Sequence, residues 1–276
     1  MKHDIRLIAS DLDGTLVNSK GEIEAENLSA LLKAQERGIY VCAFSGRFPG
    51  NASLVMHKYG FTGPVCASNG CEILDTPFGR PIETHLMEKN AARRATELLN
   101  RYEADYFIFA PGVVYNSNPE IRHHTELSDF KTLYEEHGIV YCSGQESLEK
   151  ILQRGICKFY VRVNQHIEEL KQALSPVEGL YITRSGNSNI ELMPTGVDKG
   201  TALESIARYL NIPLSCCMTF GDQDNDLPML LKAGFGVAMG NADDEIKSRV
   251  WYVTDSCGSC GVGKAVRKFA LDDSDS

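Results

Sequence analysis

Residues 5–15 read Ile-Arg-Leu-Ile-Ala-Ser-Asp-Leu-Asp-Gly-Thr, an apolar run that ends in two aspartates. The run is typical of a buried strand, and Gly14 marks its end. Because side chains two residues apart in a strand point to the same side, Asp11 and Asp13 are expected to project together. Two such carboxylates repel each other unless a cation or a proton lies between them. The pattern favours a metal site, a general acid beside a nucleophile, or both; the alternative is an Asx turn with solvated acids.

Apolar strands alternate with helices around this run. Strands are predicted at 5–10, 39–44 and 65–67, with helices at 24–37 and 51–59 between them. The C-terminal part repeats the pattern, with helices at 199–210 and 226–233 and strands at 216–220 and 235–238. Strands that are apolar throughout and separated by helices predict an α/β fold, with a Rossmann-like parallel sheet covered by helices on both faces.

The middle of the chain has a different pattern of polar and apolar residues. Between about 84 and 190 the strands alternate polar and apolar residues, and Pro111-Gly112 separates two of them as in a hairpin. This pattern predicts an α+β module inserted into the parallel-sheet core. The expected domains are therefore a core formed by 1–83 and 191–276, and an inserted domain at 84–190.

Composition excludes some classes of partner. The chain has 276 residues, a net charge of −9 and a pI near 5.3, which argues against nucleic acid or an anionic membrane as the main partner. No segment approaches the roughly 20 apolar residues of a membrane span, so we expect a cytoplasmic protein. Most of the nine cysteines lie in apolar runs and fit reduced core thiols. Cys257 and Cys260 form a C-x-x-C, for which two incidental thiols are expected rather than zinc or a redox pair.

A second acidic cluster, Gly-Asp-Gln-Asp-Asn-Asp at 221–226, follows the apolar strand at 216–220. If a helix starts here, Asp222 and Asp226 share one face, with Asn225 beside them. Acids in a first turn also suit the helix dipole, so a capping role is the alternative. Because both acidic clusters follow core strands, and open α/β sheets bind ligands beyond the carboxyl ends of their strands, a functional role is favoured.

Candidate phosphate-binding groups follow other core strands. Ser45-Gly46 comes directly after the strand at 39–44, and a hydroxyl with free N–H groups on such a turn can hold a phosphate. Lys199 opens the next predicted helix, where its ammonium can reach an anion. Carboxylates without histidine favour Mg²⁺ over zinc. Together these residues predict a Mg²⁺ site next to a phosphate site.

The motifs resemble those of a known family. Asp11-Leu-Asp13-Gly-Thr, Ser45, Lys199 and Gly-Asp222-x-x-Asn225-Asp226 are similar, in order and position, to the four motifs of the haloacid dehalogenase superfamily of phosphohydrolases. The stretch Glu-Leu-Met-Pro-x-Gly-Val-Asp-Lys-Gly at 191–200 resembles its Cof-type branch, in which an α/β cap lies between the second and third motifs.

The resemblance implies a Mg²⁺-dependent phosphoric monoester hydrolase. Asp11 is then the nucleophile that forms an aspartyl-phosphate, and Asp13 the general acid and base. The resemblance also implies that Mg²⁺ is held by the Asp11 carboxylate, the Asp13 backbone carbonyl and Asp222, with Asp226 close by or bound through water. The implied phosphate-binding residues are Leu12, Ser45, Gly46, Lys199 and Asn225.

The inserted module is then the cap that selects the substrate. The expected substrates are small phosphorylated metabolites, sugar phosphates in particular. Expected specificity residues near hairpin or loop tips are Tyr115, Asn116, Arg184 and Asn187. Two other functions stay open at this point, namely a phosphomutase of the same superfamily and a catalytically idle binding or regulatory module.

Overall fold

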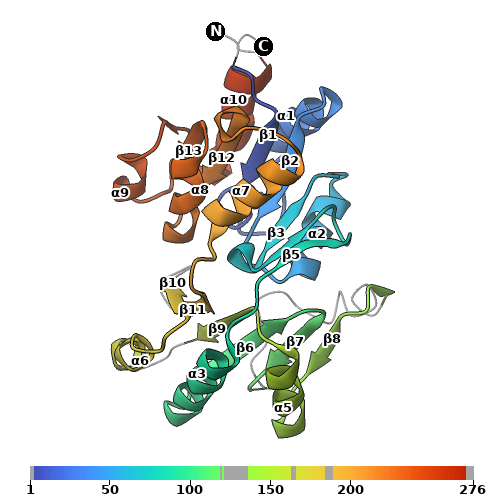
Figure 1. Cartoon of the computed structure of the whole chain (residues 1–276). Coiled ribbons are helices and arrows are strands. Elements are labelled where there is room, and N and C mark those ends of the chain that lie inside the picture. The colour runs from blue at the N-terminus through green and yellow to red at the C-terminus, as the bar shows by residue number, and fades with distance from the viewer. Residues whose placement is uncertain (1–2, 119, 121–135, 163–165, 184–188, 272–276) are drawn as a thin grey trace. The chain divides into compact units, whose positions relative to one another are not determined.

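The computed structural model describes residues 3–118, 120, 136–162, 166–183 and 189–271. The chain forms two compact units. The first consists of Met1–Glu83 and Asp198–Ser276, and the second of Thr84–Val197. Each unit has its own sheet and its own helices (Figure 1).

The first unit is built on an eight-stranded sheet. Its strands, in spatial order, are β14 (Tyr252–Val253), β13 (Phe235–Ala238), β12 (Cys217–Gly221), β1 (Leu7–Ser10), β2 (Tyr40–Phe44), β3 (Val65–Ala67), β4 (Glu72–Leu74) and β5 (Pro81–Thr84). The strands from β14 to β3 are parallel to their neighbours, and β4 is antiparallel to β3. The parallel sheet predicted from the apolar strands is confirmed.

Helices cover both faces of this sheet. They are α1 (Ala25–Glu36), α2 (Pro49–Lys58), α7 (Lys199–Tyr209), α8 (Leu227–Lys232), α9 (Asp244–Lys247) and α10 (Gly261–Val266). Leu7 and Ala9 of β1 share a buried cluster with α7 and α8, whereas Ile8 shares one with α1, α2 and α10. Successive residues of β1 therefore face opposite helical layers, as an apolar strand in a parallel sheet requires.

The strand order places a switch point beside β1. From β1 the chain proceeds through β2 to β3 on one side, and the later strands β12, β13 and β14 lie on the other side. Ser10 is level with Phe220 and with Ala43 in the sheet, so the loops after β1, β12 and β2 begin at one edge. Crevices at such switch points are where open α/β sheets bind ligands.

The second unit has a six-stranded sheet and a separate core. Its strands, in spatial order, are β10 (Leu180–Thr183), β11 (Asn189–Pro194), β9 (Lys158–Arg162), β6 (Asp105–Ala110), β7 (Val113–Asn116) and β8 (Val140–Cys142). Its apolar residues pack with those of α3 (Lys89–Arg101), α5 (Gln145–Arg154) and α6 (Ile167–Leu174). The β6–β7 pair is the hairpin predicted at Pro111-Gly112.

One domain boundary differs from the sequence-based expectation. The second unit ends at Val197, seven residues beyond the expected end at 190. The reason is that β11 pairs antiparallel with both β9 and β10 and so belongs to the second sheet. Its apolar residues Ile190 and Leu192 complete that unit's core. Among the described residues, no helix has the length and apolar character that a bilayer crossing needs.

Candidate active site

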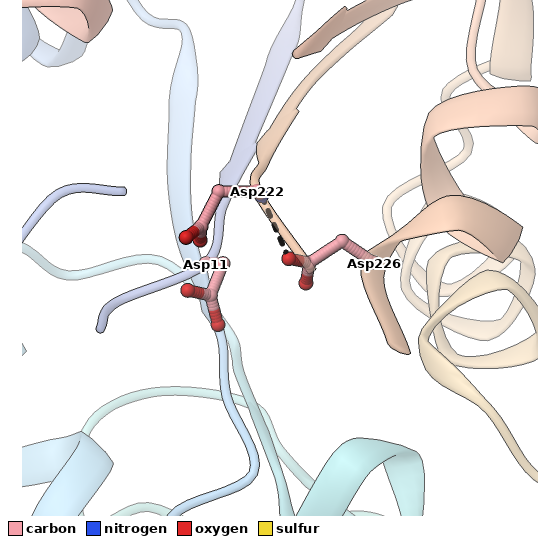
Figure 2. A group of neighbouring side chains, drawn as sticks. All are labelled: Asp11, Asp222 and Asp226. Atoms are coloured by element: carbon pink, nitrogen blue, oxygen red, sulfur yellow. Dashed lines mark hydrogen bonds between the residues drawn. The ribbon is translucent and has the colours of Figure 1, made fainter. Parts of the chain in front are cut away.

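Three aspartates converge at the switch point of the first sheet. Asp11 follows β1, while Asp222 and Asp226 lie in the segment after β12. One carboxylate oxygen of each lies within 4.8 Å of the others, and all three side chains are buried. Figure 2 shows Asp226 reaching toward Asp11 and Asp222 from the side. The expected convergence of the two acidic clusters is therefore present in the structure.

Lys199 joins this cluster from the start of α7. Its helix begins with a capping box, in which Asp198 accepts a hydrogen bond from the Thr201 backbone and Thr201 accepts one from the Asp198 backbone. The Lys199 ammonium is fully buried and donates to Asp11 Oδ1 at 2.6 Å and to Asp226 Oδ1 at 2.5 Å. The capping box fixes the residue at which α7 begins, and this position directs the Lys199 side chain toward Asp11, the candidate nucleophile.

Burial and charge act in opposite directions on these groups. Burial raises the pKa of Asp11 well above its ordinary value, and the nearby charges of Asp226, Asp222 and Asp13 add to the rise, while Lys199 opposes it. Burial also raises the pKa of Asp222, with a further contribution from Asp226. For Lys199, burial lowers the pKa, but attraction to Asp11 and Asp226 outweighs it, so the pKa lies above the ordinary lysine value.

Asp222 is held by groups from three segments. Its Oδ1 accepts from Thr15 Oγ1 at 2.8 Å, and its Oδ2 accepts from Asn241 Nδ2 at 3.1 Å and from Gln223 Nε2 at 3.2 Å. Gly14 has φ +83°, and a Cβ there would lie 2.6 Å from Asp222 Oδ2, so only glycine fits both the turn and the carboxylate. The Asp222 carboxylate therefore has a fixed orientation.

The Asp226 carboxylate accepts hydrogen bonds from the backbone of its own loop. Its Oδ2 accepts from the backbone N–H groups of Asp222 at 2.9 Å and Gln223 at 3.0 Å, while its Oδ1 accepts from Lys199. Figure 2 shows the bond from Asp222 to Asp226 as a dashed line. Both oxygens of Asp226 are thus engaged by the protein, whereas the described contacts of Asp11 engage Oδ1 alone.

The loop after β2 brings Ser45 and Arg47 to the same edge. Ser45 is buried, its backbone N–H donates to Cys66 of β3, and its hydroxyl accepts from the Arg47 N–H at 3.1 Å. The Arg47 guanidinium donates to both oxygens of Asp13, Nε at 2.8 Å and Nη2 at 2.6 Å. Asp13 is exposed, in contrast to the buried Asp11.

The buried cluster fits a divalent cation. Among the residues that the structure describes, its three carboxylates face one ammonium, which leaves two negative charges when all are ionised. All the converging ligand atoms are carboxylate oxygens, the type that Mg²⁺ prefers. Burial is the main cause of the raised pKa values of Asp11 and Asp222, and the charges of the neighbouring aspartates add to it. A bound cation would offset the repulsion among these carboxylates.

The structure places the remaining predicted residues as follows. Leu12 is fully buried, and its carbonyl accepts bonds from the turn at residues 15–17. Asn225 is buried and donates to Asn69 Oδ1 at 3.1 Å. Tyr115 was expected at a tip but packs in the second unit's core at 4% exposure, because its strand turns that side chain toward the helices. Asn116 is partly exposed at the end of β7, and Arg184 and Asn187 lie outside the described residues.

Sequence reasoning missed three site residues, namely Arg47, Asn69 and Asn241. Each lies in the loop that follows a core strand, after β2, β3 and β13 respectively. The rule that picked out Asp11 and Asp222, namely polar residues beyond the carboxyl ends of apolar strands, would have found all three had it been applied to every strand.

Comparison with known proteins agrees with this fold. Residues 8–266 match the sequence model of the haloacid dehalogenase-like hydrolases. The 5-amino-6-(5-phospho-D-ribitylamino)uracil phosphatase YcsE of Bacillus subtilis is 30% identical over 97% of both chains, and phosphatase YwpJ of the same organism is 32% identical over 91% of this chain and 94% of its own. A solved haloacid dehalogenase-like hydrolase from B. subtilis superposes with a TM-score of 0.79 at 30% identity, covering 95% of this chain and 99% of its own.

The fold and the site together define an α/β phosphohydrolase. The chain belongs to the haloacid dehalogenase-like hydrolases, in the Cof-type branch, and is a phosphoric monoester hydrolase. The superfamily expected from the four motifs is confirmed.

Proposed function

We propose that the chain is a Mg²⁺-dependent phosphatase of small phosphorylated metabolites that works through an aspartyl-phosphate on Asp11. One observation carries the proposal: the buried Asp11 carboxylate lies beside the Lys199 ammonium and two further carboxylates at the switch point of the sheet. A nucleophile and a cation site in contact are what transfer of a dianionic phosphoryl group requires.

In the first half-reaction, an Asp11 carboxylate oxygen attacks the phosphorus of the substrate in line with the ester oxygen. The bond from phosphorus to that oxygen breaks as the new bond forms. Asp13, in its protonated form, gives its proton to the leaving alcohol. Its exposed position after the Asp11 strand suits contact with a leaving group at the mouth of the site.

In the second half-reaction, Asp13 acts in the opposite direction. Its carboxylate takes a proton from a water molecule, and the water oxygen attacks phosphorus. The bond from phosphorus to Asp11 breaks, which releases inorganic phosphate and restores the carboxylate. Asp13 ends this step protonated and ready for the next substrate.

Lys199 and the donors around it hold the transferring oxygens. The lysine keeps Asp11 oriented and offers positive charge beside the phosphoryl group. Ser45, Gly46 and Asn225, with Leu12 of the Asp11 loop, are proposed to complete the set of donors. Positioning and charge stabilisation supply most of the catalysis in phosphoryl transfer, so these groups matter as much as the nucleophile.

The proposed Mg²⁺ ligands are the Asp11 and Asp222 carboxylates and the backbone carbonyl of Asp13, with Asp226 nearby. The ion would offset the repulsion between the Asp11 carboxylate and the phosphate dianion. Because both oxygens of Asp226 accept protein hydrogen bonds, its proposed part is to hold the loop and Lys199 in place.

The second unit, Thr84–Val197, is proposed to select the leaving group. Sugar phosphates are the proposed substrates, a class close to the phosphorylated ribityl chain in the name of the B. subtilis relative. Asn116, Arg184 and Asn187 are the proposed specificity residues of this unit. Replacing Asn116 with alanine should then change the ranking of substrates without lowering turnover of p-nitrophenyl phosphate.

Phosphate release tests the proposal directly. The panel comprises sugar phosphates, nucleotides, pyridoxal phosphate and p-nitrophenyl phosphate, each with Mg²⁺ and with EDTA. We expect turnover that needs Mg²⁺ and that Asp11→Asn abolishes, whereas Asp224→Asn, an exposed neighbour of the cluster, keeps it. Activity of Asp11→Asn above about a tenth of wild type would remove Asp11 as the nucleophile, since losing a nucleophile costs several orders of magnitude.

A further inference from the structure

A strained turn lies directly after β3. Ser68, Asn69 and Gly70 have φ values of +50°, +58° and +105°. Ser68 and Asn69 are also buried, at 0% and 1% exposure. Left-handed backbone is unfavourable for residues other than glycine and persists where surrounding contacts enforce it, often at functional sites. The contacts of this turn therefore indicate what the strain maintains.

The turn's backbone holds the loop after β2. The Asn69 N–H donates to the Ser45 carbonyl at 3.0 Å, and the Ser68 N–H donates to the Arg47 carbonyl at 2.8 Å. These two bonds bracket the Ser45-Gly46 segment, which is a proposed phosphate-binding element. The left-handed conformation aims both N–H groups at that segment.

The same turn reaches the other two phosphate-binding segments. The Asn69 side-chain oxygen accepts from Asn225 Nδ2 at 3.1 Å, across a sequence separation of 156 residues. At Gly70, a Cβ would lie 2.7 Å from the carbonyl oxygen of Asp198, the residue that caps the Lys199 helix. One turn thus contacts the segments that carry Ser45, Asn225 and Lys199.

We propose that Asn69 is a positioning residue for phosphoryl transfer, which holds Ser45 through its backbone and Asn225 through its amide oxygen. The inference rests on the phosphatase function proposed above. Asparagine suits both tasks, because it tolerates the left-handed region better than most residues and its side chain supplies an uncharged acceptor. Glycine satisfies the backbone requirement alone, and this difference allows a test.

The test separates stability from catalysis with Asn69→Gly. Glycine adopts φ +58° without a steric cost, so the variant is expected to keep the fold, with its melting temperature lowered only by the loss of the buried Asn69–Asn225 hydrogen bond. With Asn225 no longer held, kcat/KM should fall by about tenfold or more, because a small displacement of a catalytic donor is costly. The inhibition constant for inorganic phosphate should rise in parallel, which a merely structural role would not cause.

Two further variants make the comparison specific. Asn211 also has a left-handed backbone, with φ +53°, but is exposed after α7, so Asn211→Gly should leave kcat/KM and phosphate inhibition unchanged. If Asn69 acts through Asn225, the double variant Asn69→Gly/Asn225→Ala should lose no more than Asn225→Ala alone.

Several results would overturn the inference. They are wild-type kcat/KM and phosphate inhibition in Asn69→Gly, an equal loss in Asn211→Gly, or losses that simply multiply in the double variant. These differ from failure of the phosphatase proposal, in which folded wild-type protein releases no phosphate from any substrate of the panel.

Discussion

The Arg47 guanidinium and the Asp13 carboxylate form a two-point ion pair, with Nε 2.8 Å from Oδ2 and Nη2 2.6 Å from Oδ1. The Asp13 side chain is 61% exposed and that of Arg47 18% exposed. An ion pair this accessible contributes at most about 1 kcal/mol to stability. Its main consequence is geometric, because two parallel hydrogen bonds fix the plane of the carboxylate that we propose as the general acid.

Replacing Arg47 with lysine is expected to reduce activity by an amount that depends on the leaving group of the substrate. Lysine keeps the charge but cannot make the two-point contact, so Asp13 loses its fixed plane. Alkyl phosphates need protonation of the leaving oxygen, and for them kcat/KM should fall about tenfold, a part of the effect of general acid catalysis. For p-nitrophenyl phosphate, whose leaving group is stable as an anion, the loss should be much smaller.

Two controls accompany this comparison. Arg6→Lys, at an exposed arginine near Asp4, should leave both substrates unaffected. In an Asp13→Asn background, Arg47→Lys should have little further effect, since the group it orients is gone. An equal loss on alkyl and p-nitrophenyl phosphates would instead show that Arg47 acts on the phosphoryl group itself.

The raised pKa of Asp11 predicts a pH-dependent stability difference in metal-free protein. Burial lifts the pKa of Asp11 above the ordinary 3.8, so the folded chain holds this proton more tightly than the unfolded chain does. Ionisation of Asp11 therefore destabilises the fold as pH rises above about 4. The asparagine side chain of the Asp11→Asn variant is neutral at every pH. We expect the melting temperature of this variant in EDTA to rise relative to wild type as the pH is raised from about 4.

The measurement is a series of thermal melts of both proteins at matched ionic strength. Asp224→Asn, which removes an exposed carboxylate from the same loop, controls for the loss of one charge. A melting-temperature difference that stays constant with pH, or that falls as pH rises, would contradict the burial of Asp11.

Mg²⁺ is expected to stabilise the folded protein through Asp222. At an ion concentration about a hundred times the dissociation constant, binding should add about 2.7 kcal/mol and raise the melting temperature by about 5 °C. Asp222→Asn should lose most of this shift, since an amide oxygen replaces a carboxylate in the cluster. Calorimetric titration gives the affinity directly. A full Mg²⁺ shift in Asp222→Asn, equal to that of Asp224→Asn, would place the ion elsewhere.

The second unit contains a buried ion pair whose loss is expected to be costly. Lys158 Nζ on β9 lies 2.7 Å from Glu191 Oε1 on the neighbouring β11, and the two side chains are 0% and 2% exposed. Lys158→Met leaves the glutamate buried without its partner and should lower the free energy of unfolding by about 3–5 kcal/mol. The double variant Lys158→Met/Glu191→Leu should recover much of this loss.

Urea unfolding followed by circular dichroism measures these differences. Lys150→Met removes a matched but exposed pair with Glu146 in the same unit and should cost less than about 1 kcal/mol. Similar costs for Lys158→Met and Lys150→Met would contradict the importance of burial for the Lys158 pair.

Several features of the site followed from local sequence alone. An apolar run that ends in Asp-x-Asp-Gly places carboxylates at a strand end, and a second run that ends in Gly-Asp does the same. The parallel sheet then brings such ends to one edge. Asp11, Asp222, Asp226 and Lys199 could be grouped in this way without coordinates, and the structure brings them into contact.

Other features depended on partners far apart in the chain. Whether the tyrosine of β7 lies at a tip or in a core depends on which strand face the helices cover, and Tyr115 proved to be core. The end of the second unit depended on which sheet accepted β11, and the backbone pairing with β9 placed it at Val197. The periodicity of polar and apolar residues indicates that a strand is present, but it does not show which strand pairs with it.

The sequence by itself determined the alternation of strands and helices, the carboxylates at the strand ends and the superfamily, because each is written in residues adjacent along the chain. Only the tertiary structure decided that Arg47 meets Asp13, that Asn69 meets Asn225, and that Asn241 meets Asp222. These contacts join loops after different strands, and strand order in the sheet, set by packing of the whole core, brings those loops together.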